Sequence, residues 1–249
     1  MMRKTAFNAL VIAALAFGAS CERSARPEVV NDGIVVEDVT LVSPERAAHL
    51  LHAALVIRDG RIAEIGTSLV AGPQANRIDG HGRFLVPGLI DSHVHVGSTY
   101  RAVADEYRQA MARLLGTASL DPSRVMSIAP ARASATRWMM LDEKVKLLFG
   151  SDTGSNEGIG NPPWLNGRLE LQRWSEAGVP LSHILRAAAL DNAAAFGLAA
   201  DLGTIHVGKK ADLLLLRADP LETIAAYDAI DMIFLNGKTI PRRSLLPTD

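Results

Sequence analysis

Alternating and clustered apolar residues predict strands in the N-terminal part of the chain. β-branched and other apolar side chains recur over residues 29–42, 55–65 and 77–86, in the short-period pattern of half-buried strands. Asp59-Gly60 interrupts the second run, and this pair favours the tight turn of a β-hairpin. The three runs together predict a small β domain.

Strands are also predicted near the C-terminal end. Residues 213–216 are four consecutive leucines, and Met232 to Leu235 form a second unbroken apolar run. Both runs have the length of buried strands. Asn236-Gly237 follows the second run and indicates a turn.

The middle of the chain alternates strand and helix patterns. Pro87-Gly88 ends the β domain, and a buried strand is expected to begin at Leu89-Ile90 and to end in the Asp91–His95 segment. Residues 145–149 predict a second short strand, whereas residues 120–137 have no clear period. Apolar residues at helical spacing predict helices over residues 103–114, 169–177, 181–189 and 193–196.

Local residues indicate where the last helices begin and end. Pro180 suits the first turn of the helix over residues 181–189. Asp191 or Asn192 is expected to cap the start of the last helix, and Gly197 is expected to end it.

Composition argues for small-molecule chemistry. Of 249 residues, 48% are hydrophobic and 21% charged, and the formal net charge is -1. Such a chain can bury a core, and it has no basic run that would track phosphates. Nucleic acid is therefore not an expected partner.

The first 21 residues have the layout of a secretory signal peptide. Arg3 and Lys4 precede an apolar run from Ala9 to Phe17, and Gly18-Ala19-Ser20 precedes Cys21. The run is too short to span a membrane. We expect export to the periplasm, with membrane attachment through a lipidated Cys21, although Gly18 occupies the place where lipoprotein sites usually have Leu. The alternative is simple cleavage that leaves Cys21, the only cysteine, as a free thiol.

A pair of histidines is the first candidate for chemistry. His93 and His95 lie two residues apart, so on a strand both side chains point to the same face. Two imidazoles at the end of a buried strand suit a divalent metal. The pair alone is weak evidence, because most His-x-His pairs are incidental.

Four segments resemble the amidohydrolase superfamily, in that family's order along the chain. Phe84–His95 resembles its first barrel strand, and Leu147–Thr153 its last. Leu190–Leu198 is similar to the helix before the return to the β domain, and Gly203–Leu213 to the re-entry segment. The imidazolonepropionase-like and prolidase-like members are the most similar.

This resemblance implies an α/β fold with two parts. The first is a remnant of a metal-dependent (β/α)8 TIM-type barrel over residues 87–202. The second is a small composite β-sandwich, formed by residues 29–86 together with residues 203–240.

The resemblance also implies a site and a reaction. His93, His95 and Asp152 would be metal ligands, with zinc the expected metal, and Asp152 would also be the catalytic base and acid. The substrate would be a small amide or cyclic amide, hydrolysed at a non-peptide C–N bond or a peptide-like amide by metal-activated water.

The chain departs from the family between the two barrel segments. Residues 96–146 leave room for one or two βα units, whereas a complete barrel needs about 250 residues. No histidine occurs between His95 and His183, so two histidine ligands of the family are absent. Lys144 and Lys146 precede the last-strand segment and are poor candidates for a bridging lysine.

Several candidate residues also have plainer interpretations. Asp152 would cap the loop after its strand, and residues 161–164 would line a substrate pocket or form a rigid turn. Trp174 is expected in the core. The remaining histidines are expected to be structural or at the surface: His49, His52, His81, His183 and His206.

Three hypotheses therefore remain open. The chain is an active hydrolase, completing its site by homo-oligomerisation, or a non-catalytic binding or scaffold protein, or an internally deleted product without a stable fold. We favour the hydrolase, with catalysis impaired by the missing strands.

Overall fold

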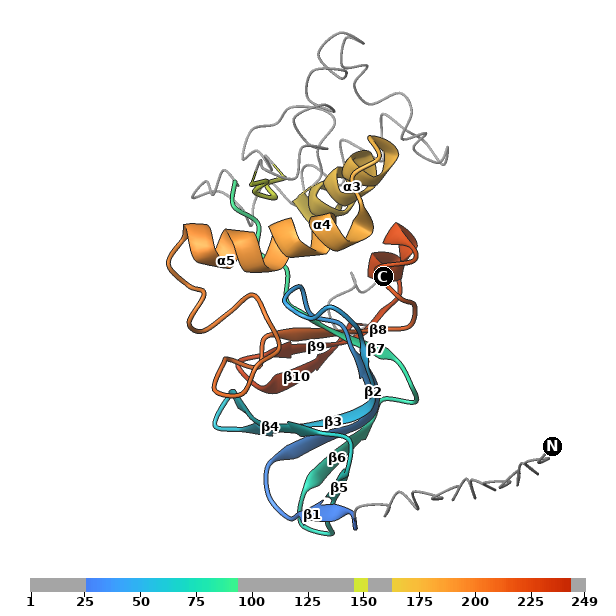
Figure 1. Ribbon diagram of the computed structural model, residues 1–249, viewed down its shortest axis with the longest axis vertical. Helices are drawn as coiled ribbons and strands as arrows, with labels where there is room; N and C mark the ends of the chain where they lie inside the picture. The colour runs from blue at the N-terminus through green and yellow to red at the C-terminus, as the bar shows by residue number, and fades with distance from the viewer. Residues whose placement is uncertain (1–25, 94–145, 152–162, 243–249) are drawn as a thin grey trace, which may run out of the picture.

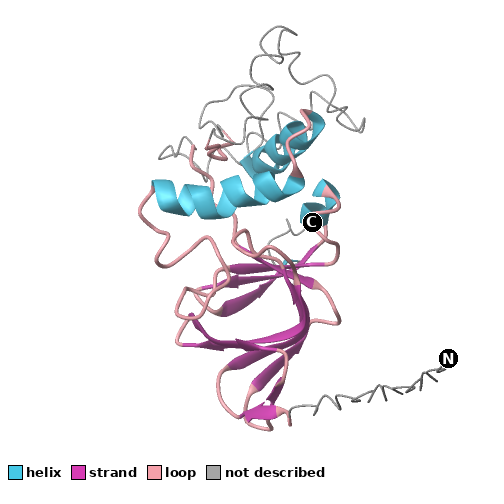
Figure 2. Cartoon of the chain, viewed as in Figure 1, coloured by secondary structure: helices cyan, strands magenta, loops and turns pink. Residues whose placement is uncertain are grey.

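The protein has a mixed α/β fold in which helices pack against one end of a curved β-sheet (Figures 1 and 2). The computed structural model describes residues 26–93, 146–151 and 163–242. Figure 1 shows helices α3, α4 and α5 at one end of the sheet and strands β1 and β5 at the other.

The strands fall where the apolar patterns predict them. The N-terminal strands are β1 (Glu28–Val30), β2 (Ile34–Leu41), β3 (Leu50–Arg58), β4 (Arg61–Gly66), β5 (Leu69–Ala71), β6 (Asn76–Asp79) and β7 (Phe84–Pro87). The C-terminal strands are β8 (Leu213–Leu216), β9 (Ile230–Leu235) and β10 (Lys238–Pro241).

Strands from both ends of the chain form a single sheet. Its order is β10-β9-β8-β7-β2-β3-β4, and β6 pairs with β2 beside this path. The two halves of the chain meet where β7 and β8 pair antiparallel, with Leu85 opposite Leu215. β1 and β5 form a separate parallel pair. The sequence that leaves the sheet after β7 and the sequence that returns at β8 are therefore neighbours.

The predicted hairpin turn is confirmed. β3 and β4 pair antiparallel up to Arg58 and Arg61. Asp59 and Gly60 both have positive φ, 50° and 76°, as a two-residue turn matched to the strand twist requires. The Asn236-Gly237 turn is also present, and a Cβ on Gly237 would lie 2.8 Å from the Gly60 Cα. The two turns therefore pack directly together.

Burial on both faces makes β2 the centre of the β region. Val35, Val36, Val39 and Leu41 are all fully buried. Val36 belongs to the cluster that includes Leu85 and Phe234, and Val35 to the cluster on the side of β1 and β5. A strand that is covered on both faces is apolar at consecutive positions instead of alternating.

The helical region contains a π-helical turn. Its elements are α3 (Pro163–Glu176), α4 (Leu181–Arg186), the π-helical turn η2 (Ala187–Asp191) and α5 (Asn192–Ala195). The last three follow one another without a break, because Arg186, Ala187, Asp191 and Asn192 all have right-handed helical φ and ψ.

Two expectations about these helices are wrong. Neither Asp191 nor Asn192 caps a helix start, because the backbone is already helical there and Asp191 makes no capping hydrogen bond. The rigid turn considered for residues 161–164 is not present at Pro163 and Trp164, which lie in α3. Gly197 does follow the last helix with φ of 70°, and Pro180 immediately precedes α4.

The two barrel-type segments are not regular strands. Residues 88–93 and 146–151 do not form β-strands, contrary to the sequence-based expectation. Their backbone groups bond to a helix carbonyl, to side chains and to each other, rather than to a continuous ladder.

A shared core joins the helices to the sheet. Phe149, Trp174, Ile184 and Leu185 are buried in one cluster with Val86 and other apolar residues of the sheet. Trp174 is therefore a core residue as expected, and its ring meets that of Phe149 edge to face at 5.8 Å. The helices cover the same end of the sheet from which residues 88–93 emerge.

Some sequence-based predictions lie outside the described residues. They concern the signal peptide with Cys21, the helix over residues 103–114, Lys144, His95, Asp152 and residues 161–162. Within the described ranges, no helix has the length and apolar character needed to cross a membrane.

One ion-pair network links the N-terminal and C-terminal halves of the sheet. Asp231 accepts hydrogen bonds from Arg83 of the N-terminal half and from Arg217, whose Nη2 lies 2.6 Å away. The bond from Arg217, and the charge of Arg83, hold the pKa of Asp231 below its usual value. Because the folded-state pKa is lowered, this stabilisation is present above the unfolded-state pKa and is lost as pH falls through the folded-state pKa.

We therefore expect Asp231→Asn to lower the free energy of unfolding at pH 7 by about 1–2 kcal/mol. The difference from wild type should shrink below about pH 4, as the carboxylate becomes protonated. Urea unfolding across this pH range measures it. Asp201→Asn, which removes an exposed pair with Arg61, is the control and should change stability much less than Asp231→Asn does, because solvent screens an exposed pair. An undiminished difference at pH 3 would contradict the ion-pair explanation.

Candidate functional site

The two barrel-type segments meet at one junction. The backbone N–H of Ser92 donates to the Phe149 carbonyl over 2.9 Å, and the Ser92 hydroxyl donates to the same oxygen over 2.7 Å. Residues 88–93 therefore lie beside residues 146–151, although more than fifty residues separate them in sequence.

Asp91 orients both sides of this junction. Its Oδ1 accepts from the Ser151 N–H at 2.9 Å and from the His93 N–H at 3.2 Å. One carboxylate oxygen thus fixes the backbone that carries the candidate metal ligand His93 and the backbone that precedes Asp152.

Gly150 allows these two backbones to approach closely. A Cβ at Gly150 would lie 2.8 Å from the His93 Cβ and 3.1 Å from the Ser92 Oγ. Real Cβ atoms do not come so close, so any side chain here would push His93 away from its present place. Position 150 therefore requires glycine, because any larger residue would collide with His93.

The helix holds the junction from the other side. Asn192 Nδ2 donates to the carbonyls of Ile90 and Phe149, at 2.6 Å and 2.8 Å. The Ile90 N–H donates to the Ala188 carbonyl of the π-helical turn over 2.7 Å. Both backbone polar groups of Ile90 are therefore bonded to the helix.

Helix α3 adds a second amide contact. Asn166 Nδ2 donates to the Ser151 carbonyl over 2.5 Å, and Asn166 is buried. Ser151 is thus held at its N–H by Asp91 and at its carbonyl by Asn166. The chain that leads to position 152 leaves the junction from a fixed point.

The described residues place one of the three predicted site residues. His93 lies at the junction and is exposed, whereas His95 and Asp152 lie outside the described ranges. The His93 Cβ lies beside Gly150 and its backbone N–H is bonded to Asp91. An exposed imidazole held in this way fits the ligand chemistry of a divalent metal. In those same ranges, no three or more His, Cys, Asp or Glu side chains come together as a metal site.

The other described histidines lie away from this junction. His49 is 3.5 Å from the Asp219 carboxylate and packs against Phe84. His52 pairs with Asp38, and the exposed His206 ring contacts the neighbouring Val207 carbonyl. These contacts agree with the structural and surface roles expected for them. Lys146 is exposed at the start of its segment.

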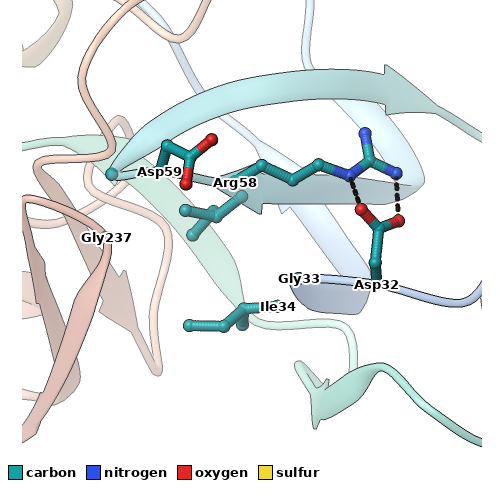
Figure 3. A pocket seen from close by; sticks show the side chains of 8 residues that line it. Asp32, Gly33, Ile34, Arg58, Asp59 and Gly237 are labelled. Atoms are coloured by element: carbon teal, nitrogen blue, oxygen red, sulfur yellow. Dashed lines mark hydrogen bonds and ion pairs between the residues drawn. The ribbon is translucent and has the colours of Figure 1, made fainter.

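A hollow in the β domain offers little chemistry (Figure 3). Figure 3 shows Arg58 and Asp32 joined there by two hydrogen bonds, of 2.7 Å and 2.8 Å, and Arg58 also binds Glu64. The bonds from Arg58 lower the pKa of Asp32. The hollow is lined by Asp32, Gly33, Ile34, Ile57, Arg58, Asp59, Gly60 and Gly237. Its arginine is already neutralised by carboxylates, and we do not assign it a catalytic role.

Sequence reasoning missed three residues that build the junction. Asp91 and Ser92 were available in the first-strand motif, directly before His93, but only the histidines were singled out. Asn192 was noticed as a helix cap, because Asn is common at that position. Nothing in the local sequence indicates that its amide reaches two distant carbonyls.

Comparison with known proteins also points to the amidohydrolase family. Residues 120–240 match the model of the amidohydrolase family. A 5'-deoxyadenosine deaminase from Methanothermobacter thermautotrophicus is 34% identical over 73 residues, which are 28% of this chain and 17% of that protein. An imidazolonepropionase from Saccharopolyspora erythraea is 51% identical over 47 residues, 19% of this chain and 12% of that protein. The matched segments thus span less than a fifth of these relatives.

Solved structures are similar over a larger share of the chain. A Xaa-Pro dipeptidase with methionine bound in its active site has a TM-score of 0.60 and 13% identity, covering 84% of this chain and 99% of that chain. At this identity the similarity concerns the fold. The family match and the sequence relatives support placing this chain in the amidohydrolase superfamily.

Proposed function

We propose that the protein is a metal-dependent hydrolase of C–N bonds in small amides. The observation that carries the proposal is the position of His93, exposed at the junction where residues 88–93 meet residues 146–151. The names of the relatives support the reaction class, since deaminases and imidazolonepropionases appear among them.

The architecture that we propose follows the same family. Residues 87–202 would be a remnant of the (β/α)8 barrel, and residues 29–86 with residues 203–240 a composite β-sandwich. The pairing of β7 with β8 supports this division, because it joins the two halves of the sheet directly below the junction.

His93 and His95 would hold the metal, together with Asp152, and zinc suits such a set of nitrogen and oxygen ligands. When bound, the metal would lower the pKa of a water molecule and polarise the scissile carbonyl. Asp152 would accept a proton from the attacking water and deliver it to the leaving nitrogen. Asp91 would hold the backbones of both ligand segments in place.

The substrate proposed is a small amide or cyclic amide. We also propose export through the N-terminal signal peptide to the periplasm, with attachment through a lipidated Cys21. Self-association would supply ligands that the short central segment does not, since no histidine occurs between His95 and His183.

Metal content and hydrolysis test the proposal together. We expect purified wild type to bind close to one equivalent of zinc and to hydrolyse cyclic amides or dipeptides in a chelator-sensitive manner. His93→Ala should lower metal affinity by more than about tenfold, because a direct ligand is lost. Asp152→Asn should lower turnover by about 100-fold or more through loss of the proton carrier.

Controls separate this function from the alternatives. His206→Ala, which removes an exposed histidine of the β domain, should change neither metal content nor turnover. Metal binding with no activity, unchanged by Asp152→Asn, would favour a binding or scaffold protein. Absence of both metal and activity from monodisperse protein would refute the hydrolase, and a non-cooperative melt would indicate an unstable fragment.

Gly150→Ala tests whether close contact at the junction matters. Its Cβ would meet the His93 Cβ at 2.8 Å, so we expect a loss of stability of about 1–3 kcal/mol and weaker metal binding. Gly167→Ala is the matched control, because open space surrounds Gly167 in α3; there alanine should stabilise the helix by about 0.5–1 kcal/mol. Thermal or urea unfolding measures both, and equal stability of the two variants would contradict the packing argument.

A further inference from the structure

Asn192 is an unusual residue to find fully buried in a helix. Its side-chain amide has no solvent exposure, and burial of a polar group is unfavourable unless hydrogen bonds replace its water. Its Nδ2 is satisfied by the carbonyls of Ile90 and Phe149. Its Oδ1 accepts no hydrogen bond from the described part of the chain.

The π-helical turn before Asn192 completes the contact. In an α-helix the Asn192 N–H would bond to the Ala188 carbonyl, four residues earlier. Here it bonds instead to the carbonyls of Ala187 and Ala189. The Ala188 carbonyl is thereby released and accepts the Ile90 N–H over 2.7 Å. π-Helical turns within α-helices are frequent at functional sites.

The two carbonyls bound by Asn192 lie next to the candidate ligand segment. Ile90 is three residues before His93. Phe149 directly precedes Gly150, which lies so close to His93 that a Cβ at position 150 would be 2.8 Å from the His93 Cβ. The Phe149 carbonyl also accepts both bonds from Ser92. One side-chain amide therefore bridges the first and last barrel segments at their point of contact.

We propose that Asn192, with the π-helical turn η2, is a positioning residue that fixes the two ligand-bearing segments relative to each other. This inference rests on the proposed function for its link to metal binding. Asn192 does not touch the reacting atoms; it acts through the backbones of Ile90 and Phe149. Its Oδ1, which has no hydrogen-bond partner among the described residues, argues against a role in stability alone, since an apolar side chain would avoid that penalty.

Hydrogen exchange tests the positioning without any metal. In Asn192→Ala, we expect the Ile90, Ser92 and Ser151 amides of the full-length protein to exchange about tenfold faster or more, because the bridge that holds their local structure is lost. Asn192→Leu keeps the number and branching of the side-chain heavy atoms and should give the same selective change if the alanine variant folds poorly.

Ser43→Ala is a matched control. Ser43 is also buried, and its Oγ accepts from the Ile205 N–H over 2.9 Å, so this change likewise leaves a buried backbone group unpaired. It should speed exchange at Ile205 and leave Ile90, Ser92 and Ser151 unchanged. A uniform rise in exchange in the Asn192 variants, or no rise at the three junction amides, would overturn the positioning role.

Cobalt supplies a second, spectroscopic readout of the metal site. We expect Asn192→Ala to bind Co²⁺ about tenfold more weakly and to change its visible spectrum, whereas Ser43→Ala should bind it as wild type does. Failure of wild type to bind cobalt would reject the proposed metal site, and the exchange result would still decide the positioning role. Unchanged affinity and spectrum in Asn192→Ala would overturn the link between Asn192 and the metal ligands.

Discussion

The carbonyl oxygen of Phe149 is the acceptor on which the arrangement of the site depends. It accepts hydrogen bonds from the Ser92 N–H, the Ser92 hydroxyl and the Asn192 amide. These donors belong to two distant parts of the chain, so this one atom joins residues 88–93, residues 146–151 and the helix. The bonds lie beside a buried apolar cluster, where an unpaired partner would be costly. The directions of these bonds therefore determine where His93 can lie.

The composite sheet explains why these segments meet at all. β7 and β8 pair up to Pro87 and Leu213, and the Gly88 N–H continues the contact to the Asp212 carbonyl over 2.8 Å. The chain thus leaves the sheet for the junction at the same place where it later returns. The helix from Leu181 to Ala195 packs between this exit point and the junction and contributes Ala188 and Asn192 to it. Sheet pairing and helix packing together fix the base of both segments.

Much of the fold could be predicted from the sequence, because local chemistry specifies it. Asp59-Gly60 determines a turn through backbone preference alone, and the leucines of β8 require burial wherever they lie. The details of the junction could not be predicted in the same way. Asn is a residue type common at helix starts, but Asn192 lies inside a continuous helix. The π-helical turn directly before it shifts the backbone hydrogen-bond register. The expected strands at residues 88–93 and 146–151 lack a ladder because their partners are a side-chain carboxylate, a side-chain amide and a helix carbonyl. Such contacts depend on tertiary structure, which periodicity does not encode.

The position of His93 and the supply of further metal ligands depend on different parts of the chain. The position of His93 depends on Asp91, Gly150 and Asn192, which lie in three separate regions of the sequence and are held by the sheet and the helix. The two mid-barrel histidine ligands that the family resemblance implies would have to come from a part of the sequence that holds no histidine between His95 and His183. The bonds that bring residues 88–93 and 146–151 together are made by other parts of the chain, the junction itself and the helix. Under the proposed function, completing the metal coordination, rather than assembling the junction, would be the step on which catalysis depends.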